Sequence, residues 1–371
     1  MANTERRLSG QTGISGPKPH PAGVVLRTVL LALAYSAAIA WALWMFVTRP
    51  GMDWYSRARF GDSIYSRCER PFVARVLLPW TVQAITAVTP AATRHYLASA
   101  IRGLISHEPR LSYASDCGFE FGVTIFLLLA CLVAFACVLR VLARRFVSAP
   151  GRVEGVIPVC ALLLLPVMYT YMNYVYDLPT LLLFTLALAL IAARSRWFYL
   201  VYILAVLNKE TAILLSIPWF LENRRELASR SLVSGLALQF GIWLVIRGVI
   251  TYLYRNTPGV MFEWWHWQRN LNVLARMVRA PFDGSFAMYF RRHWYKTIAL
   301  AAVPALLLSL KSSPPFLRRA LLMAVPIFVL SLVGGFFDEL RTYYEVYAVV
   351  VLILASGLAT LVRPRPKSAA V

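Results

Sequence analysis

Long apolar stretches recur along almost the whole chain, and short polar or charged segments separate them. Many of these stretches approach the ~20 residues that an α-helix needs to cross a hydrocarbon layer about 30 Å thick. The expected fold class is therefore an all-α polytopic membrane protein. The pattern predicts membrane-spanning helices over residues 24–47, 119–139, 155–173, 178–193, 228–250, 294–310, 319–336 and 343–362.

Residues 197–221 depart from this pattern, because the polar run Asn208-Lys209-Glu210-Thr211 stands between two shorter apolar runs. A single span would place Lys209 and Glu210 at the centre of the bilayer, where ionised groups are costly. Two short helices, over 197–207 and 211–221, avoid this cost by turning at the polar run. They bring the predicted number of transmembrane helices to ten.

Basic residues gather in the short loops on one predicted side of the membrane, which by the positive-inside rule is the cytoplasmic side. Both termini then face the cytoplasm. Residues 1–23, rich in Gly, Pro, Ser and Thr, are expected to be a disordered cytoplasmic tail, and 363–371 a cytoplasmic C-terminal tail. Residues 24–362 form a single transmembrane domain with long outer loops at 48–118 and 251–293.

The first outer loop contains two further apolar segments that carry charged residues. We predict helices at 72–90 and 91–106 that lie along the outer membrane surface. The alternative, an eleventh span at 72–90, would move the basic residues of 140–154 to the outer side. The same loop contains Cys68 and Cys117, which either form a disulfide or stay as two free thiols.

Composition supports the membrane assignment, since 59% of the residues are apolar, 15% are charged and the mean hydropathy is +0.61. These values exclude a soluble enzyme, a disordered chain and a disulfide scaffold. The net charge of +21 is explained by the cytoplasmic loops rather than by nucleic-acid binding, because no basic run with stacking aromatic residues is present. The expected partner is the lipid bilayer.

Acidic residues are scarce, so their positions are informative. Asp53, shortly after the first span, is a candidate general base at the outer boundary, and Asp62 is a second candidate. The alternative for each is a solvated loop acid, which is the commoner role of a single loop aspartate. Asp177, at the outer start of a span, is a candidate substrate-binding residue or an N-cap that stabilises the helix.

The polar run between the two short helices is the most informative group, because ionisable residues at membrane depth are functional candidates. Glu210 is a candidate catalytic residue, and Asn208 and Lys209 are candidate substrate-binding residues, with Lys209 suited to a phosphate. The alternative is a self-neutralising turn capped by Asn208.

Further candidate substrate-binding residues lie at the predicted outer boundary. Residues 336–345 can instead form an interfacial aromatic belt with local ion pairs, and the segment around His266 can instead anchor the chain at the membrane surface. Arg341 in particular suits bidentate phosphate recognition. These candidates are Arg70, Arg75, His266, Glu339, Arg341 and Tyr344.

The sequence contains no Gly-rich phosphate loop, no metal-spaced His and Cys set and no serine-nucleophile elbow. We therefore expect no metal site and no cofactor.

In its arrangement the chain resembles the GT-C class of integral membrane glycosyltransferases. A short cytoplasmic tail and one span precede a long outer loop with an acid near its start and two juxtamembrane helices, and many spans follow. Three short motifs are similar to those of poorly characterised bacterial proteins of this type. They are Arg70-Pro71-Phe72-Val73-Ala74-Arg75-Val76-Leu77-Leu78-Pro79-Trp80, Tyr176-Asp177-Leu178-Pro179-Thr180 and Asn208-Lys209-Glu210-Thr211.

The resemblance implies a bacterial inner-membrane enzyme that takes a sugar from a polyprenyl-phosphate donor without a metal. Asp53, or less readily Asp62, would be the base, and basic groups such as Lys209 and Arg341 would stabilise the leaving phosphate. The chain departs from the class in having a single first-loop acid and no large soluble C-terminal domain, so the acceptor stays open. The alternatives are a transporter or flippase, with residues 197–221 as a broken-helix site, and a noncatalytic assembly subunit.

Overall fold

The computed structural model describes residues 21–147, 153–169, 171–260, 266–279 and 301–362, together with the single residues 282 and 298. The predicted C-terminal tail, most of the predicted N-terminal tail and the first part of the predicted span at 294–310 lie outside the described residues. The first helix begins at Pro21, three residues before the predicted start of the span.

Helices make up most of the described part of the chain, which contains no β-strand and one isolated bridge between Arg70 and Gly259. Five of the described helical stretches are long and apolar enough to cross a membrane, and the chain is a helical membrane protein. These stretches are Val25–Gly51, Pro109–Phe146, Ser229–Leu253, Pro315–Val333 and Leu340–Leu361. Shorter apolar helices are Leu77–Val88, Ile157–Met168, Asp177–Ala192, Phe198–Asn208 and Ala301–Ser312.

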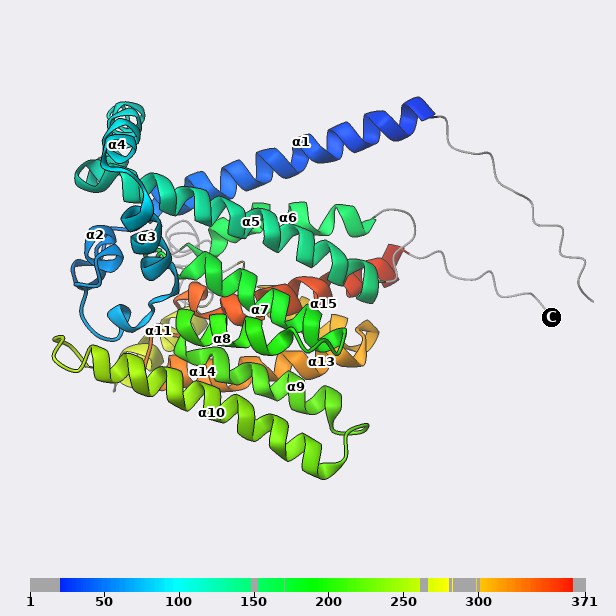
Figure 1. Ribbon diagram of the computed structural model, residues 1–371. Coiled ribbons are helices and arrows are strands. Elements are labelled where there is room, and N and C mark those ends of the chain that lie inside the picture. Colours follow the sequence, from blue (N-terminus) through cyan, green and yellow to red (C-terminus); the bar gives the residue numbers. More distant parts are fainter. Residues whose placement is uncertain are drawn as a thin grey trace, which may run out of the picture.

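The helices of the bundle run roughly side by side, and the beginning of the first lies toward the same end of the bundle as the end of the last (Figure 1). They are α1 (Pro21–Phe46), α5 (Gly118–Phe146), α6 (Ile157–Leu164), α7 (Asp177–Ala192), α8 (Phe198–Asn208), α9 (Ser216–Asn223), α10 (Ser229–Leu253), α13 (Pro315–Ala320), α14 (Ala324–Val333) and α15 (Tyr344–Val362).

Contacts at the two ends of the bundle show that α7, α8 and α9 run back and forth. At one end the Asn208 side chain donates to the Tyr176 carbonyl, which joins the end of α8 to the start of α7. At the opposite end Arg194, after α7, pairs with Glu226, after α9. We call the first of these ends, which holds Asn208 and Tyr176, the site end.

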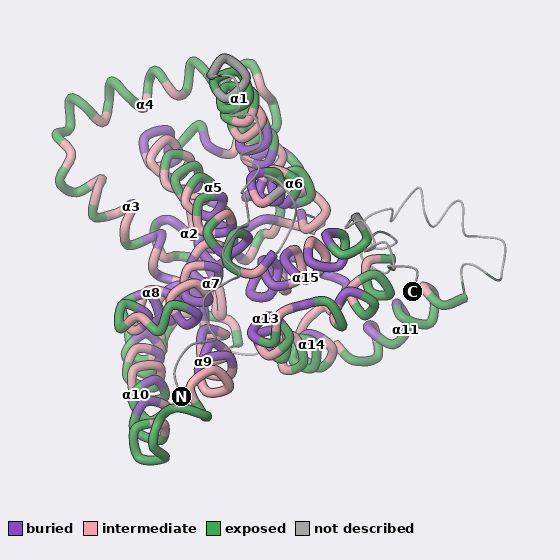
Figure 2. The backbone as a smooth tube through the Cα atoms, turned by 90° about the vertical axis from the view of Figure 1, so that its right-hand side faces the viewer, coloured by how far each residue is buried: buried purple, intermediate pink, exposed green. Residues whose placement is uncertain are grey.

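Helices α2 (Phe60–Ile64), α3 (Leu77–Val88), α4 (Ala91–Ile105) and α11 (Trp267–Arg279) lie at the site end. Figure 2, which looks along the long helices, shows α3 and α4 from the side, so these two cross the bundle rather than follow it. Helix α3 is about 18 Å long at 1.5 Å per residue, which favours a surface helix over an eleventh span.

Several predicted boundaries are wrong. The predicted helix at 72–90 begins only at Leu77, because Phe72–Ala74 form a 3₁₀ turn and Arg75 leaves helical geometry. The predicted span at 155–173 stops being helical after Met168. The second short helix starts as a 3₁₀ turn, η7 (Glu210–Leu215), before α9.

Helix α7 is the centre of the core and packs closely on α5, α8 and α15. It is apolar around its whole circumference, as expected of a helix surrounded by others, and Leu181, Phe184 and Ala187 are buried. The peripheral helices α1 and α10 instead expose large apolar side chains such as Leu33 and Val245, which in a membrane protein face lipid. A buried α7 holds Asp177 at the site end.

Candidate functional site

Charged side chains from separate parts of the chain meet at the site end. We call this group the ionic cluster. It draws on the turn before α3, the start of α7, the turn between α8 and α9, the last third of α10, and the segment that leads into α15 with the first turn of that helix. Its members are Arg75, Asp177, Lys209, Glu210, Arg247, Glu339, Arg341 and Glu345.

Glu210 lies between two arginines. The Arg75 guanidinium contacts both carboxylate oxygens, at 2.8 and 3.4 Å, and Arg247 Nη2 lies 3.8 Å away. Arg247 also donates to the Ala74 carbonyl at 2.8 Å, which holds α10 against the turn before α3. Arg75 and Arg247 together offset the cost of burying the Glu210 carboxylate.

Lys209 and Glu345 form the most buried pair of the cluster. Lys209 Nζ donates to Glu345 Oε1 at 2.6 Å, and the Thr211 hydroxyl donates to the same oxygen at 2.8 Å. The Glu345 side chain is fully buried and that of Lys209 is 10% exposed. The pair ties the turn after α8 to the first turn of α15.

Arg341 lies next to two carboxylates and an aromatic ring. Its Nη2 donates to Glu339 at 2.9 Å, and its Nη1 lies 3.7 Å from Asp177. Its guanidinium lies 4.2 Å from the centre of the Tyr174 ring, within cation–π distance. Arg341 Nε is buried and makes no hydrogen bond, so one strong donor is left for a further acceptor.

A stack of aromatic rings supports Arg75 and Arg341. Phe72 stacks on Tyr174 at 5.0 Å and Tyr174 stacks on Tyr176 at 5.2 Å. Arg75 lies over Tyr176 at 4.2 Å, as Arg341 does over Tyr174, and Arg75 also donates to the Tyr176 hydroxyl. The rings hold both guanidinium groups in fixed positions next to each other.

Two predicted binding residues are buried beneath the cluster. The Asn208 amide donates to the Tyr176 carbonyl at 3.1 Å and to Thr180 at 2.8 Å, so it fastens α8 to α7. Tyr344 is 1% exposed, and its hydroxyl makes no hydrogen bond. Asp177 accepts the Tyr174 N–H at 2.9 Å, which precedes the helix, so it organises the chain before α7 rather than capping the N–H groups of its first turn.

The two predicted first-loop acids lie apart from the ionic cluster. Asp53 Oδ1 accepts the Phe60 N–H at 2.9 Å, at the start of α2, where Asp62 also lies. Burial raises the pKa of Asp53, although the Phe60 N–H and Arg59 act in the opposite direction. No Lys or Arg lies within salt-bridge distance of Asp53 in the described part of the chain.

The segment between α6 and α7 connects Asp53 with the cluster. The Asn173 N–H donates to the Gly51 carbonyl at 3.2 Å, and its amide donates to Phe46 at 2.7 Å, so Asn173 holds the chain just before Asp53. Tyr174 and Tyr176 follow directly and carry the two arginines. Residues 173–176 therefore contact both the chain just before Asp53 and two arginines of the cluster, Arg75 and Arg341.

Arg70 and His266 also lie outside the cluster. The backbone of Arg70 pairs with the segment after α10, where its N–H donates to Pro258 at 2.9 Å, and its buried Nε makes no hydrogen bond. The His266 N–H donates to the Val333 carbonyl at 3.2 Å, and its ring lies 4.6 Å from that of Phe336.

Sequence reasoning missed Arg247 and did not single out Glu345. Arg247 is 7% exposed within a largely apolar helix, and an ionisable residue at membrane depth is itself a functional signal. That signal was sufficient to find it. Nothing in the sequence indicates that Glu345, one residue after Tyr344, pairs with Lys209.

Cys68 and Cys117 are free thiols, which excludes the disulfide alternative. Cys68 packs with Ala58, Val73 and the tyrosines of the aromatic stack, whereas Cys117 belongs to the main core. Burial raises the pKa of Cys68 to about 11.

In the described residues no group of three or more His, Cys, Asp or Glu side chains is placed to hold a metal ion. Comparisons of the chain with known protein families, curated proteins and solved structures found no match.

Proposed function

We propose that this chain is a membrane glycosyltransferase with ten transmembrane helices and a GT-C-like fold. It moves a sugar from a polyprenyl-phosphate donor to a lipid, glycan or protein acceptor on the non-cytoplasmic face of a bacterial inner membrane. The observation that carries the proposal is that four cations, Arg75, Lys209, Arg247 and Arg341, meet at the site end, each beside a carboxylate. A lipid-linked phosphate lies at that depth, with its chain in the bilayer.

In this proposal Arg341 binds the donor phosphate. Glu339 accepts from Nη2 and Asp177 lies 3.7 Å from Nη1, so the buried Nε, which makes no hydrogen bond, is the donor assigned to a phosphate oxygen. Lys209 and Arg75, each paired with a carboxylate, are further cations of the same cluster. As the bond from the sugar to the phosphate breaks, negative charge grows on the phosphate, and these fixed cations stabilise it without rearranging.

Asp53 is the proposed base. It is half-buried, its pKa is raised, and among the described residues no Lys or Arg lies within salt-bridge distance of it, whereas Glu210 has Arg75 and Arg247. It takes the proton of an acceptor hydroxyl while the acceptor oxygen bonds to the anomeric carbon and polyprenyl phosphate leaves. Glu210, whose oxygens are engaged by Arg75, is assigned to positioning of that arginine.

The test is transfer by the purified chain in liposomes, supplied with a panel of radiolabelled polyprenyl-phosphate sugars and a membrane-lipid extract as acceptor. We expect release of polyprenyl phosphate from one donor, and loss of that release in Arg341→Gln and Asp53→Asn. Arg110→Gln, at an exposed position outside the cluster, is the matched control. The proposal fails if no donor is consumed, or if both variants retain full activity.

A transporter or flippase is the second candidate, because α8 ends at Asn208 and Lys209 is fully extended before η7, as in broken-helix substrate sites. Movement of a lipid-linked sugar across the liposome membrane without any change in its covalent structure would select this function instead.

A further inference from the structure

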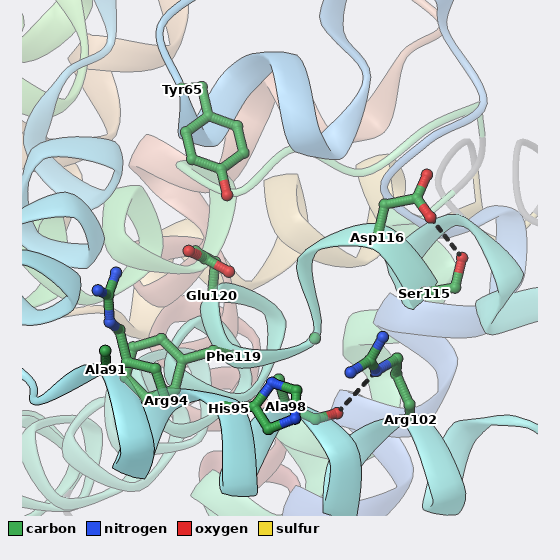
Figure 3. Close-up of a pocket in the computed structure, with 11 residues that line it drawn as sticks. Tyr65, Ala91, Arg94, His95, Ala98, Arg102, Ser115, Asp116, Phe119 and Glu120 are labelled. Atoms are coloured by element: carbon green, nitrogen blue, oxygen red, sulfur yellow. Dashed lines mark hydrogen bonds between the residues drawn. The ribbon is translucent and has the colours of Figure 1, made fainter.

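A pocket of about 310 Å³ lies between α4 and the start of α5, apart from the ionic cluster. This volume is at the lower end of the range for small-molecule sites. Figure 3 shows Arg94, His95 and Arg102 projecting from α4 on one side, with Tyr65, Asp116 and Glu120 across from them. The pocket therefore has a basic wall and an acidic wall.

The charges on the two walls do not neutralise each other. Within the described residues no ion pair joins Arg94 or Arg102 to Asp116 or Glu120. Arg102 Nε instead donates to the Ala98 carbonyl of its own helix, and the buried Arg94 Nε makes no hydrogen bond. Opposite charges held apart across a pocket fit a ligand that carries a negative group at one end and a positive group at the other.

Close packing keeps the walls in place. A Cβ atom at Gly118 would lie 3.0 Å from the Ala98 carbonyl oxygen, so the backbones of α4 and α5 touch at the base of the pocket. Gly122, one turn further along α5, likewise leaves room for Ile101. Because these contacts fix the spacing of the helices, the two charged walls do not collapse onto each other.

The position of α4 indicates the source of the ligand. Its pocket side carries Arg94, Ala98 and Arg102 at four-residue spacing, whereas Tyr96 and Leu104, on other faces of the helix, are 73% and 79% exposed. A helix that crosses the site end and combines basic and exposed apolar faces has the character of an interfacial helix. The pocket then lies at the level of lipid headgroups.

We propose that this pocket binds the headgroup of a zwitterionic phospholipid with a primary ammonium group, of the phosphatidylethanolamine type. Arg94, His95 and Arg102 bind its phosphate, and Asp116 and Glu120 accept hydrogen bonds from its ammonium. The proposal needs a membrane setting but not the proposed glycosyl transfer.

The test is native mass spectrometry of the full-length protein in detergent, with phosphatidylethanolamine, phosphatidylcholine and phosphatidylglycerol of identical acyl chains at equal mole fraction. We expect phosphatidylethanolamine to be retained about tenfold more than either of the others, because only its ammonium donates charge-assisted hydrogen bonds. Glu120→Gln combined with Asp116→Asn removes this preference, whereas Arg94→Gln combined with Arg102→Gln weakens retention of all three lipids.

His107→Gln and Arg110→Gln, exposed positions just beyond α4, are matched controls that keep the wild-type preference. The nearly isosteric Glu120→Gln alone serves where the double variant does not fold. Equal retention of the three lipids by the wild type, a preference for phosphatidylglycerol, or an unchanged preference in the Glu120 variants would each overturn the proposal.

Discussion

Removing the charge of Lys209 tests whether the buried pair at the centre of the cluster holds the site end together. In Lys209→Met the Glu345 carboxylate loses its 2.6 Å partner and keeps only the Thr211 hydroxyl. The Glu345 side chain is fully buried, so water does not replace the lost contact. Breaking a buried pair on one side typically costs ~3–5 kcal/mol.

We expect Lys209→Met to lower the free energy of unfolding by about that amount, measured by denaturant titration in mixed micelles. Adding Glu345→Gln removes the unpaired charge and keeps an oxygen for Thr211, so the double variant regains at least about 2 kcal/mol. The matched control is Arg194→Gln, which breaks a pair whose side chains are 50% and 54% exposed. Exposed pairs are worth at most ~1 kcal/mol.

The reasoning is refuted if Lys209→Met costs no more than Arg194→Gln, or if Glu345→Gln makes the Lys209 variant less stable. The double variant also separates structure from function. It is expected to fold but to release little polyprenyl phosphate, because one cation of the ionic cluster is gone.

Substitutions at Asp53, Asn270 and Gly235 test other parts of the account. The pKa of Asp53 is raised in the folded state, so the free energy of unfolding falls as pH rises from the ordinary aspartate pKa to the raised one, and Asp53→Asn should remove that fall. The Asn270 amide donates to three carbonyls around the end of α14 at 2.8 to 3.1 Å. Asn270→Ala should therefore lower the free energy of unfolding by ~1–3 kcal/mol, and Asn270→Asp, which lacks the amide donor, should be no more stable than Asn270→Ala. A Cβ at Gly235 would lie 2.3 Å from the Trp219 ring, so Gly235→Ala should lower the melting temperature, whereas Gly241→Ala, with open space around it, should not.

The sequence predicts much of the helical framework, because length and apolarity decide whether a segment crosses a bilayer. The predicted spans at 178–193 and 228–250 agree closely with α7 and α10. The turn at Lys209 was also predictable, since two ionised residues in succession are costly at the bilayer centre.

The loss of helix after Met168 was not predictable, because the aromatic residues that follow continue the apolar pattern. These residues make tertiary contacts that the sequence pattern does not reveal, because the Tyr174 and Tyr176 rings stack on each other and lie under Arg341 and Arg75. The pairing of cluster members likewise depends on how distant helices pack. The sequence names Lys209, Glu210 and Arg341 as candidates, but the geometry selects their partners, and it places Asp53 outside the cluster.

The most direct test of the central claim is the structure of the protein in a lipid nanodisc supplied with polyprenyl phosphate. We predict density for the phosphate at the site end, within hydrogen-bond distance of Arg341 Nε, with the isoprenoid chain running from there along apolar helix faces into the bilayer. Phosphate density at the opposite end of the bundle, or a ligand-free cluster at saturating lipid, would contradict the account.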